Sequence, residues 1–122
     1  MAYRVIFCGS RHWTDEATVA WYINRLPADT VVVQGGAPGA DAIAQRLAES
    51  RHLPVETFDA DWNRLGRRAG PARNREMLAR GADAVYAFRM PGRSPGTDHM
   101  VRIAREAGVP VVFVRPGDHS AS

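Results

Sequence analysis

The chain has 122 residues, of which 45% are hydrophobic and 24% charged, a composition typical of a globular protein and not of a disordered one. This length fits one domain, and no apolar run approaches the roughly 18 residues of a membrane-spanning helix. The net charge is only +3 and all 16 basic residues are arginine. Arginine suits planar contact with phosphate, but codon bias in a GC-rich genome gives the same preference, so the charge alone does not argue for nucleic acid.

The N-terminus and the residue types that bind metals further limit the classes of protein to which this chain can belong. The chain runs from Met1 straight into a strand-like segment, so we expect no signal peptide and a cytoplasmic location. Cys8 is the only cysteine, which excludes an internal disulfide and a cysteine-based zinc cluster. Metal-ligand spacing is absent among the four histidines, His12, His52, His99 and His119. We therefore predict no structural metal and no resident cofactor.

Short apolar runs alternate with segments of helical period along the chain. The predicted strands are Tyr3–Cys8, Thr30–Gln34, Val55–Phe58, Ala84–Phe88 and Val109–Val114. The predicted helices are Asp15–Leu26, Ala40–Ser50, Ala72–Arg80 and Asp98–Ala107. This alternation predicts an α/β fold, a single Rossmann-like three-layer domain with a mostly parallel sheet of about five strands and helices on both faces.

The boundaries of this domain and its longest connection also follow from the pattern. We place the domain at residues 1–116 and read residues 117–122 as a disordered tail. Thr14 is the expected N-cap of the first helix, because its hydroxyl can accept an amide hydrogen bond. The polar, arginine-rich connection over residues 59–71 is the longest, and long loops in compact domains are often functional.

Ligands of parallel sheets bind beyond the carboxyl ends of the strands, so the residues after each strand matter most. After the first strand, Gly9 permits close backbone approach, Ser10 offers a hydroxyl and Arg11 a guanidinium fork. We assign Gly9, Ser10 and Arg11 to ligand binding, although a plain turn would need only the glycine.

The second strand is followed by the most glycine-rich segment of the chain. Gly35, Gly36, Gly39 and Ala40 stand before a helix and form a backbone able to wrap a phosphate at the helix N-terminus. The spacing is neither that of a P-loop nor that of GxGxxG. Asp41 follows, and its carboxylate could cap the helix or accept a hydrogen bond from a ribose hydroxyl.

The segment before the fourth predicted strand also carries candidate ligand contacts. Gly70 and Pro71 are expected to initiate the third helix, which places Arg73 and Asn74 in its first turn, where an anion would sit. A surface salt bridge is the alternative for Arg73.

A second glycine-rich, hydroxyl-bearing turn precedes the last helix. Its candidate residues are Ser94, Gly96 and Thr97, and Thr97 could equally be an ordinary N-cap. Two such turns in one small sheet favour a single ligand between them.

The tryptophans leave alternatives open. Trp13 and Trp62 lie in segments flanking the proposed site, and either could stack on a base or be partly buried. Trp21 lies at helical spacing and fits the core.

Taken in order, these segments resemble the SLOG superfamily, which joins the DprA DNA-processing proteins and the lonely-guy phosphoribohydrolases, and within it the small YspA/YpsA-related branch. The resemblance spans nearly the whole chain. It rests on Gly9-Ser10-Arg11, on Gly35-Gly36-Ala37-Pro38-Gly39-Ala40-Asp41, on Asp61-Trp62, on Ala69-Gly70-Pro71-Ala72-Arg73-Asn74 and on Ser94-Pro95-Gly96-Thr97. It implies a ligand derived from a nucleotide, such as a nucleoside phosphate or a molecule like NAD or ADP-ribose.

The likeness to the lonely-guy enzymes bears on catalysis. Their catalytic arginine lies in a segment that Arg73 and Met77 match, and Gly96-Thr97 match part of a second motif. His99 and Met100 stand where that motif has two glutamates. A glycosidase-like step needs a carboxylate, which Asp98, one position away, or Asp41 could supply.

Three hypotheses follow. The first is a binding domain for a nucleotide derivative. The second is a hydrolase of the N-glycosidic bond of a nucleoside phosphate, with Asp98 and Arg73 as its catalytic residues. The third, implied by the DprA resemblance, is binding of single-stranded nucleic acid, to which the arginine-rich segment 64–68 would contribute. Relatives pair through helices, so we also expect a homodimer through the helix that bears Trp21 and Tyr22.

Overall fold

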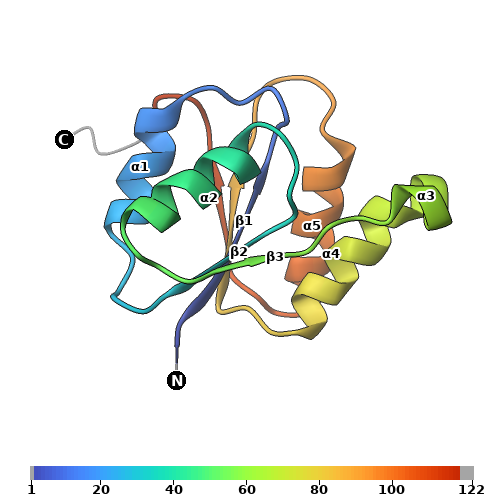
Figure 1. Cartoon of the computed structure of the whole chain (residues 1–122). Helices are drawn as coiled ribbons and strands as arrows, with labels where there is room; N and C mark the ends of the chain where they lie inside the picture. Colours follow the sequence, from blue (N-terminus) through green and yellow to red (C-terminus); the bar gives the residue numbers. More distant parts are fainter. Residues whose placement is uncertain (1, 119–122) are drawn as a thin grey trace.

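Strands and helices alternate throughout the computed structural model, which describes residues 2–118 (Figure 1). The strands are β1 (Arg4–Gly9), β2 (Val31–Gln34), β3 (Val55–Thr57), β4 (Ala84–Phe88) and β5 (Val111–Val114). The helices are α1 (Glu16–Asn24), α2 (Ala40–Ser50), the short α3 (Trp62–Leu65), α4 (Ala69–Ala79) and α5 (Pro95–Glu106), with a 3-10 turn, η1 (Gly66–Arg68), before α4.

The five strands form one parallel sheet in the order β3-β2-β1-β4-β5. The central strand β1 is fully buried at Val5, Ile6 and Phe7. Successive side chains of a strand point to opposite faces; accordingly Val5 and Phe7 join one core cluster and Ile6 and Cys8 the other. A strand buried on both faces explains why its sequence is continuously apolar.

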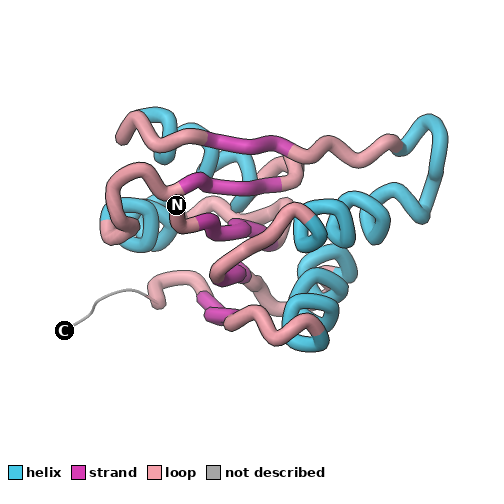
Figure 2. The backbone as a smooth tube through the Cα atoms, turned by 90° about the horizontal axis from the view of Figure 1, so that it is seen from below, coloured by secondary structure: helices cyan, strands magenta, loops and turns pink. Residues whose placement is uncertain are grey.

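Helices cover both faces of the sheet, as Figure 2 shows with the strands between two groups of helices. Helices α1 and α2 pack on one face, and α4 and α5 pack on the other. This arrangement confirms the predicted Rossmann-like three-layer α/β fold. Within residues 2–118, no helix is long and apolar enough to span a membrane.

The start of α1 differs from its prediction. The N-cap is Asp15, whose Oδ1 accepts a hydrogen bond from the Thr18 amide at 3.1 Å. The expectation for Thr14 was wrong by one residue because a carboxylate that reaches the amide three positions later makes a strong cap.

The start of α4 differs more, and the difference concerns the site. The helix begins at Ala69, so Gly70 and Pro71 lie inside its first turn, where the missing amide of proline is tolerated. Arg73 and Asn74 therefore lie in the second turn, and the prediction of a first-turn position was wrong. The connection over residues 59–71 is not a plain loop either, since it contains α3 and η1.

Two further boundaries are the start of α5 and the end of the described chain. Helix α5 starts at Pro95 with Ser94 at the N-cap, so Thr97 lies in the first turn of the helix and is not its cap. Beyond β5, the Gly117 amide donates to Asp15 Oδ2 at 2.7 Å, which places the end of the described chain against α1. The rest of the predicted tail, residues 119–122 with His119, lies outside the described residues.

Candidate functional site

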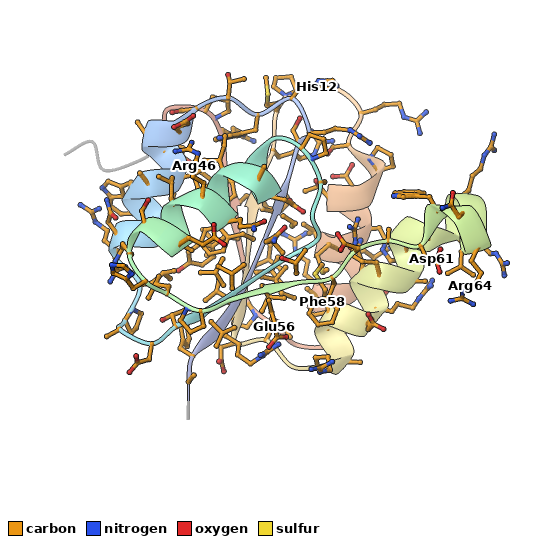
Figure 3. The ribbon with its side chains drawn as sticks, in the orientation of Figure 1. His12, Arg46, Glu56, Phe58, Asp61 and Arg64 are labelled. Carbon is orange, nitrogen blue, oxygen red and sulfur yellow. The ribbon has the colours of Figure 1, made fainter. Side chains whose placement is uncertain are left out.

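The order of the strands sets the position of the candidate site at the carboxyl edge of the sheet. Strand β1 lies between β2 and β4, and the chain turns from β2 to one face and from β4 to the other. This is the switch point at which open α/β sheets bind ligands. His12, in the loop after β1, lies at this edge (Figure 3).

Three predicted segments meet at Gly9. A Cβ atom on Gly9 would lie 2.4 Å from the Phe88 carbonyl oxygen and 2.8 Å from the Ala40 Cβ, so glycine is required for this contact. The Ser10 amide donates to the Phe88 carbonyl at 2.9 Å, and the Ser10 carbonyl accepts the Ala40 amide at 3.2 Å. The Ser10 hydroxyl accepts the His12 amide at 3.1 Å, so it stabilises its own turn.

The loop between β2 and α2, residues 35–39, forms the glycine loop of the site. Gly39 has φ +81°, and a Cβ atom there would lie 2.3 Å from the Ser10 carbonyl oxygen. Residues with a side chain rarely adopt this conformation, and the close approach excludes them independently. The glycine loop is therefore packed tightly against the turn after β1.

Asp41 holds the glycine loop from inside. Its Oδ2 accepts the Gly35 amide at 2.9 Å and the Ala37 amide at 3.4 Å. The side chain is buried, and burial raises its pKa to about 6, even though the two amides and the charge of Arg73 act in the opposite direction. Asp41 is not the cap of α2, since the N-cap is Gly39 and Asp41 lies in the first turn; its Oδ2 binds the backbone of the loop instead.

Arg73 and Asn74 connect the glycine loop to the start of α5. Arg73 Nη1 donates to the Gly35 carbonyl at 2.6 Å, and its Nε donates to Asn74 Oδ1 at 3.1 Å. The buried Asn74 in turn donates from Nδ2 to the Gly96 carbonyl at 3.1 Å and lies 3.1 Å from His99 Nδ1. Four predicted site residues, Gly35, Arg73, Asn74 and Gly96, are thus joined in one chain of hydrogen bonds.

A depression of about 100 Å³ lies beside Arg73. Its lining combines acidic, basic and small residues, namely Asp59, Asp61, Arg64, Leu65, Ala69, Ala72, Arg73 and Glu76. Asp61 and Arg64 form an ion pair at 3.1 Å on the projecting α3 (Figure 3). Asp59 and Asp61 were not predicted as ligand contacts from the sequence, although both follow β3 and the rule for the ends of parallel strands applies to them equally.

Asp98 lies elsewhere. Its carboxylate forms a two-point ion pair with Arg89, at 2.8 and 3.1 Å, which holds the pKa of this exposed carboxyl below its usual range. It borders a different depression, of about 420 Å³, formed with residues of α5 and β5. The structure therefore does not bring the two predicted catalytic residues, Asp98 and Arg73, to one cavity.

The remaining candidates have these positions. The Ser94 hydroxyl donates to the Thr97 hydroxyl at 3.0 Å, and Thr97 is buried. Gly36 and Arg11 are exposed.

The three tryptophans differ in their exposure to solvent. Trp13 is 1% exposed and packs edge-on against Phe88, so it belongs to the core and is not available to a base. Trp62 is 56% exposed. Trp21 is only partly buried, with the Arg25 guanidinium 3.8 Å from its ring.

Comparisons with known proteins agree with the resemblance. A family profile described as the YspA, cpYpsA-related SLOG family matches residues 3–65, which contain the glycine loop and end before Arg73. The Gene 61 protein of Mycobacterium phage D29 is 46% identical over 118 residues, covering 89% of this chain and 94% of the phage protein.

Solved structures share the fold, and a DNA-processing protein is one of them. DNA processing protein A (DprA) from Streptococcus pneumoniae has a TM-score of 0.60 at 20% identity, over 93% of this chain. This chain spans 59% of the DprA chain, so the likeness concerns the fold alone. In residues 2–118, no three histidine, cysteine, aspartate or glutamate side chains are grouped to hold a metal ion.

Proposed function

The chain belongs to the YspA- and cpYpsA-related SLOG family, and from that premise we propose that it binds a phosphate-bearing nucleotide or nucleotide derivative at the glycine loop. Membership of this family supports a role connected with nucleotides or nucleic acids. A glycine-rich loop at a helix N-terminus is suited to binding phosphate. Nucleoside phosphates and molecules like ADP-ribose or NAD all carry one.

The observation that carries this proposal is the position of Arg73 on the glycine loop. Its Nη1 is held 2.6 Å from the carbonyl oxygen of Gly35, the first residue of the loop that leads from β2 into the 11-residue helix α2. A guanidinium has five N–H donors, and among the described residues Arg73 uses only Nη1 and Nε in hydrogen bonds. The remaining donors and the positive end of α2 are both suited to a phosphate.

The second glycine-rich turn contributes through Asn74. Because Asn74 bonds to Gly96 while Arg73 bonds to Gly35, two adjacent residues of α4 link the first turn of α5 to the glycine loop. Both helices have an acidic first turn, with Asp41 in α2 and Asp98 in α5, but Arg73 binds the loop that precedes α2, so we favour that side as the anion site. We assign the phosphate of the ligand to the N-terminal side of α2. We propose that the hydroxyl of Ser94 contacts another polar group of the ligand, farther from α2.

Ribose hydroxyls need acceptors, and the carboxylates beside Arg73 offer them. Asp59 and Asp61 border the same depression as Arg73, whereas Asp41 binds the loop backbone and Asp98 binds Arg89. Both oxygens of Asp61 already bind Arg64, so we propose Asp59 as the ribose contact. This assignment places the sugar between the glycine loop and α3.

Arg73→Ala tests the proposal directly. Hydrogen bonds to charged groups contribute about 1.5–3 kcal/mol each, so the variant should bind AMP or ADP-ribose at least tenfold more weakly by titration calorimetry. Arg75→Ala is the matched control, because Arg75 has the same charge on the same helix and is exposed. Equal affinities for wild type and Arg73→Ala would contradict the proposal, provided that circular dichroism shows both folded.

Hydrolysis of the N-glycosidic bond is the second candidate, and one observation favours it. Asp41 has a pKa near 6 and lies close enough to Arg73 to feel its charge, so a carboxyl that changes protonation near neutrality adjoins the proposed phosphate site. Such groups serve in acid–base catalysis. Release of free base from a nucleoside monophosphate, lost in Asp41→Asn or Asp98→Asn, would establish turnover and identify the carboxylate that it requires.

A further inference from the structure

Trp62 is an unusually exposed aromatic side chain for a chain of this composition. It is 56% exposed, while Trp13 is 1% exposed and Trp21 is partly buried. Leaving an indole in water forgoes roughly the 25 cal/mol per Å² that burial of its apolar area would provide. A single exposed aromatic residue needs no explanation by itself, so its surroundings decide what it does.

The backbone that carries Trp62 is well anchored despite the shortness of α3. Asp61 caps the helix, its Oδ1 accepting the Arg64 amide at 3.1 Å, and its Oδ2 pairs with Arg64 Nε at 3.1 Å. At the other end, the Gly66 amide donates to the Trp62 carbonyl. The indole is therefore presented from a fixed turn, which lowers the entropy lost when a ligand stacks on it.

The indole packs against α4, the helix that carries Arg73. Its Cη2 atom is 3.5 Å from the place that a Cβ atom on Gly70 would occupy. Gly70, Arg73 and Asn74 stand three and four positions apart in α4, so they are neighbours on one side of that helix. The indole thus contacts α4 about one helical turn before Arg73, the residue whose guanidinium is assigned to phosphate.

The charge around Trp62 suits an anionic ligand. Arg64, Arg67 and Arg68 are exposed on the same projecting segment, which Figure 1 shows extending from the body of the domain beyond α4. Among the described residues, neither Arg67 nor Arg68 takes part in an ion pair. One aromatic residue among arginines does not resemble an apolar protein-docking patch, but it does resemble the stacking platforms that bind unpaired bases.

We propose that Trp62 is the platform on which the base of the bound nucleotide stacks, with its phosphate at Arg73 and the glycine loop. The inference rests on the proposed function and adds the requirement for a nucleobase. A phosphate site alone would accept a sugar phosphate, whereas a site that includes Trp62 distinguishes a nucleotide from the same molecule without its base. Stacking is tolerant of base identity, so Trp62 selects the class of ligand and not the particular base.

Titration calorimetry with AMP and ribose 5-phosphate tests this inference separately from the phosphate site. For Trp62→Ala we expect the affinity for AMP to fall about 5- to 150-fold, which is the ~1–3 kcal/mol of one stacked base. The affinity for ribose 5-phosphate should stay unchanged, and Trp62→Phe should retain most of the AMP affinity. Trp21→Phe, on α1, is the control and should bind both compounds as the wild type does.

Each result decides between distinct claims. If Trp62→Ala binds AMP as well as the wild type does, the stacking role is wrong while the phosphate site stands. If the wild type binds neither compound, the proposed function fails and the stacking role with it. A short oligo(dT) forms the last arm: if the wild type binds it and not AMP, and Trp62→Ala abolishes that binding, then the base belongs to single-stranded DNA and the proposal of a free nucleotide is overturned.

Discussion

The ionisation of Asp41 is tied to the shape of the site, because one of its oxygens accepts hydrogen bonds from two amides of the glycine loop, those of Gly35 and Ala37. In the folded protein its pKa is raised from 3.8 to about 6 by burial. The folded state therefore holds this proton more tightly than the unfolded state does. The contribution to stability is fully present below pH 3.8 and is lost as the pH rises through about 6.

Asp41→Asn should remove this pH dependence. Between about pH 4.5 and 7.5, the free energy of unfolding of the wild type should fall relative to that of the variant by about 2 kcal/mol. Urea titrations of both proteins across this range measure the difference, in which the other carboxyls cancel. A constant difference across the range would show that Asp41 does not titrate there.

Residue types could be predicted from the sequence, but side-chain directions could not. Arg73 and Gly35 are 38 positions apart and still form a hydrogen bond, as the rule for the edge of parallel sheets implied. Asp98 and His99, in contrast, are adjacent. One helical step turns a side chain by about 100°, so Asp98 meets Arg89 while His99 meets Asn74.

At the scale of elements, the glycine loop depends on Gly39 for two separate reasons, a positive φ and contact with the Ser10 carbonyl. Gly108, after α5, provides the matched control, since its φ is +77° and a Cβ atom there would meet no other atom within 4 Å. The two sites therefore separate backbone strain from close approach.

Gly39→Ala should destabilise the domain by more than Gly108→Ala does. Strain alone costs about 1–2 kcal/mol per residue, and the overlap at Gly39 adds to it and displaces the glycine loop. Thermal unfolding of both variants gives the comparison, and AMP binding by Gly39→Ala should weaken as well. Equal melting temperatures for the two variants would mean that the loop and the turn after β1 are not packed as described.

The helices also show what the sequence pattern leaves undetermined. The periodicity predicted α2 with its observed bounds, because a glycine run and an amphipathic stretch mark its start. For α4 it placed the start at Ala72, three residues late, because Gly70 and Pro71 read as a boundary although both fit inside a first turn. That shift moved Arg73 from the first turn to the second without removing it from the site.

At the scale of the whole molecule, the alternation of strands and helices was sufficient to predict the fold. Every strand is parallel and β1 is buried on both faces, which gives the continuous apolar runs seen in the sequence. The exposure of each aromatic residue was not predictable in this way. Trp13 and Trp62 both lie outside the main helices, and Trp13 is the buried one because it packs against Phe88.

We also expect two copies of the chain to pair through α1. Trp21 is only partly buried there, and it packs edge-on against Tyr22 of the same helix. Trp21→Glu would place a charge in such an interface and should convert a dimer into a monomer, as measured by light scattering after size-exclusion chromatography. A monomeric wild type at working concentration would contradict this expectation.

The most direct test of the central claim is thermal unfolding of the wild type with nucleoside mono-, di- and triphosphates, NAD and ADP-ribose, followed by chromatography of each mixture. A ligand at about a hundred times its dissociation constant should add about 2.7 kcal/mol to the free energy of unfolding, a shift of several degrees for a domain of this size. We predict such a shift with at least one of these compounds, recovered intact, and its loss in Arg73→Ala. No shift with any of them, or an equal shift in Arg73→Ala, would contradict a nucleotide site at the glycine loop.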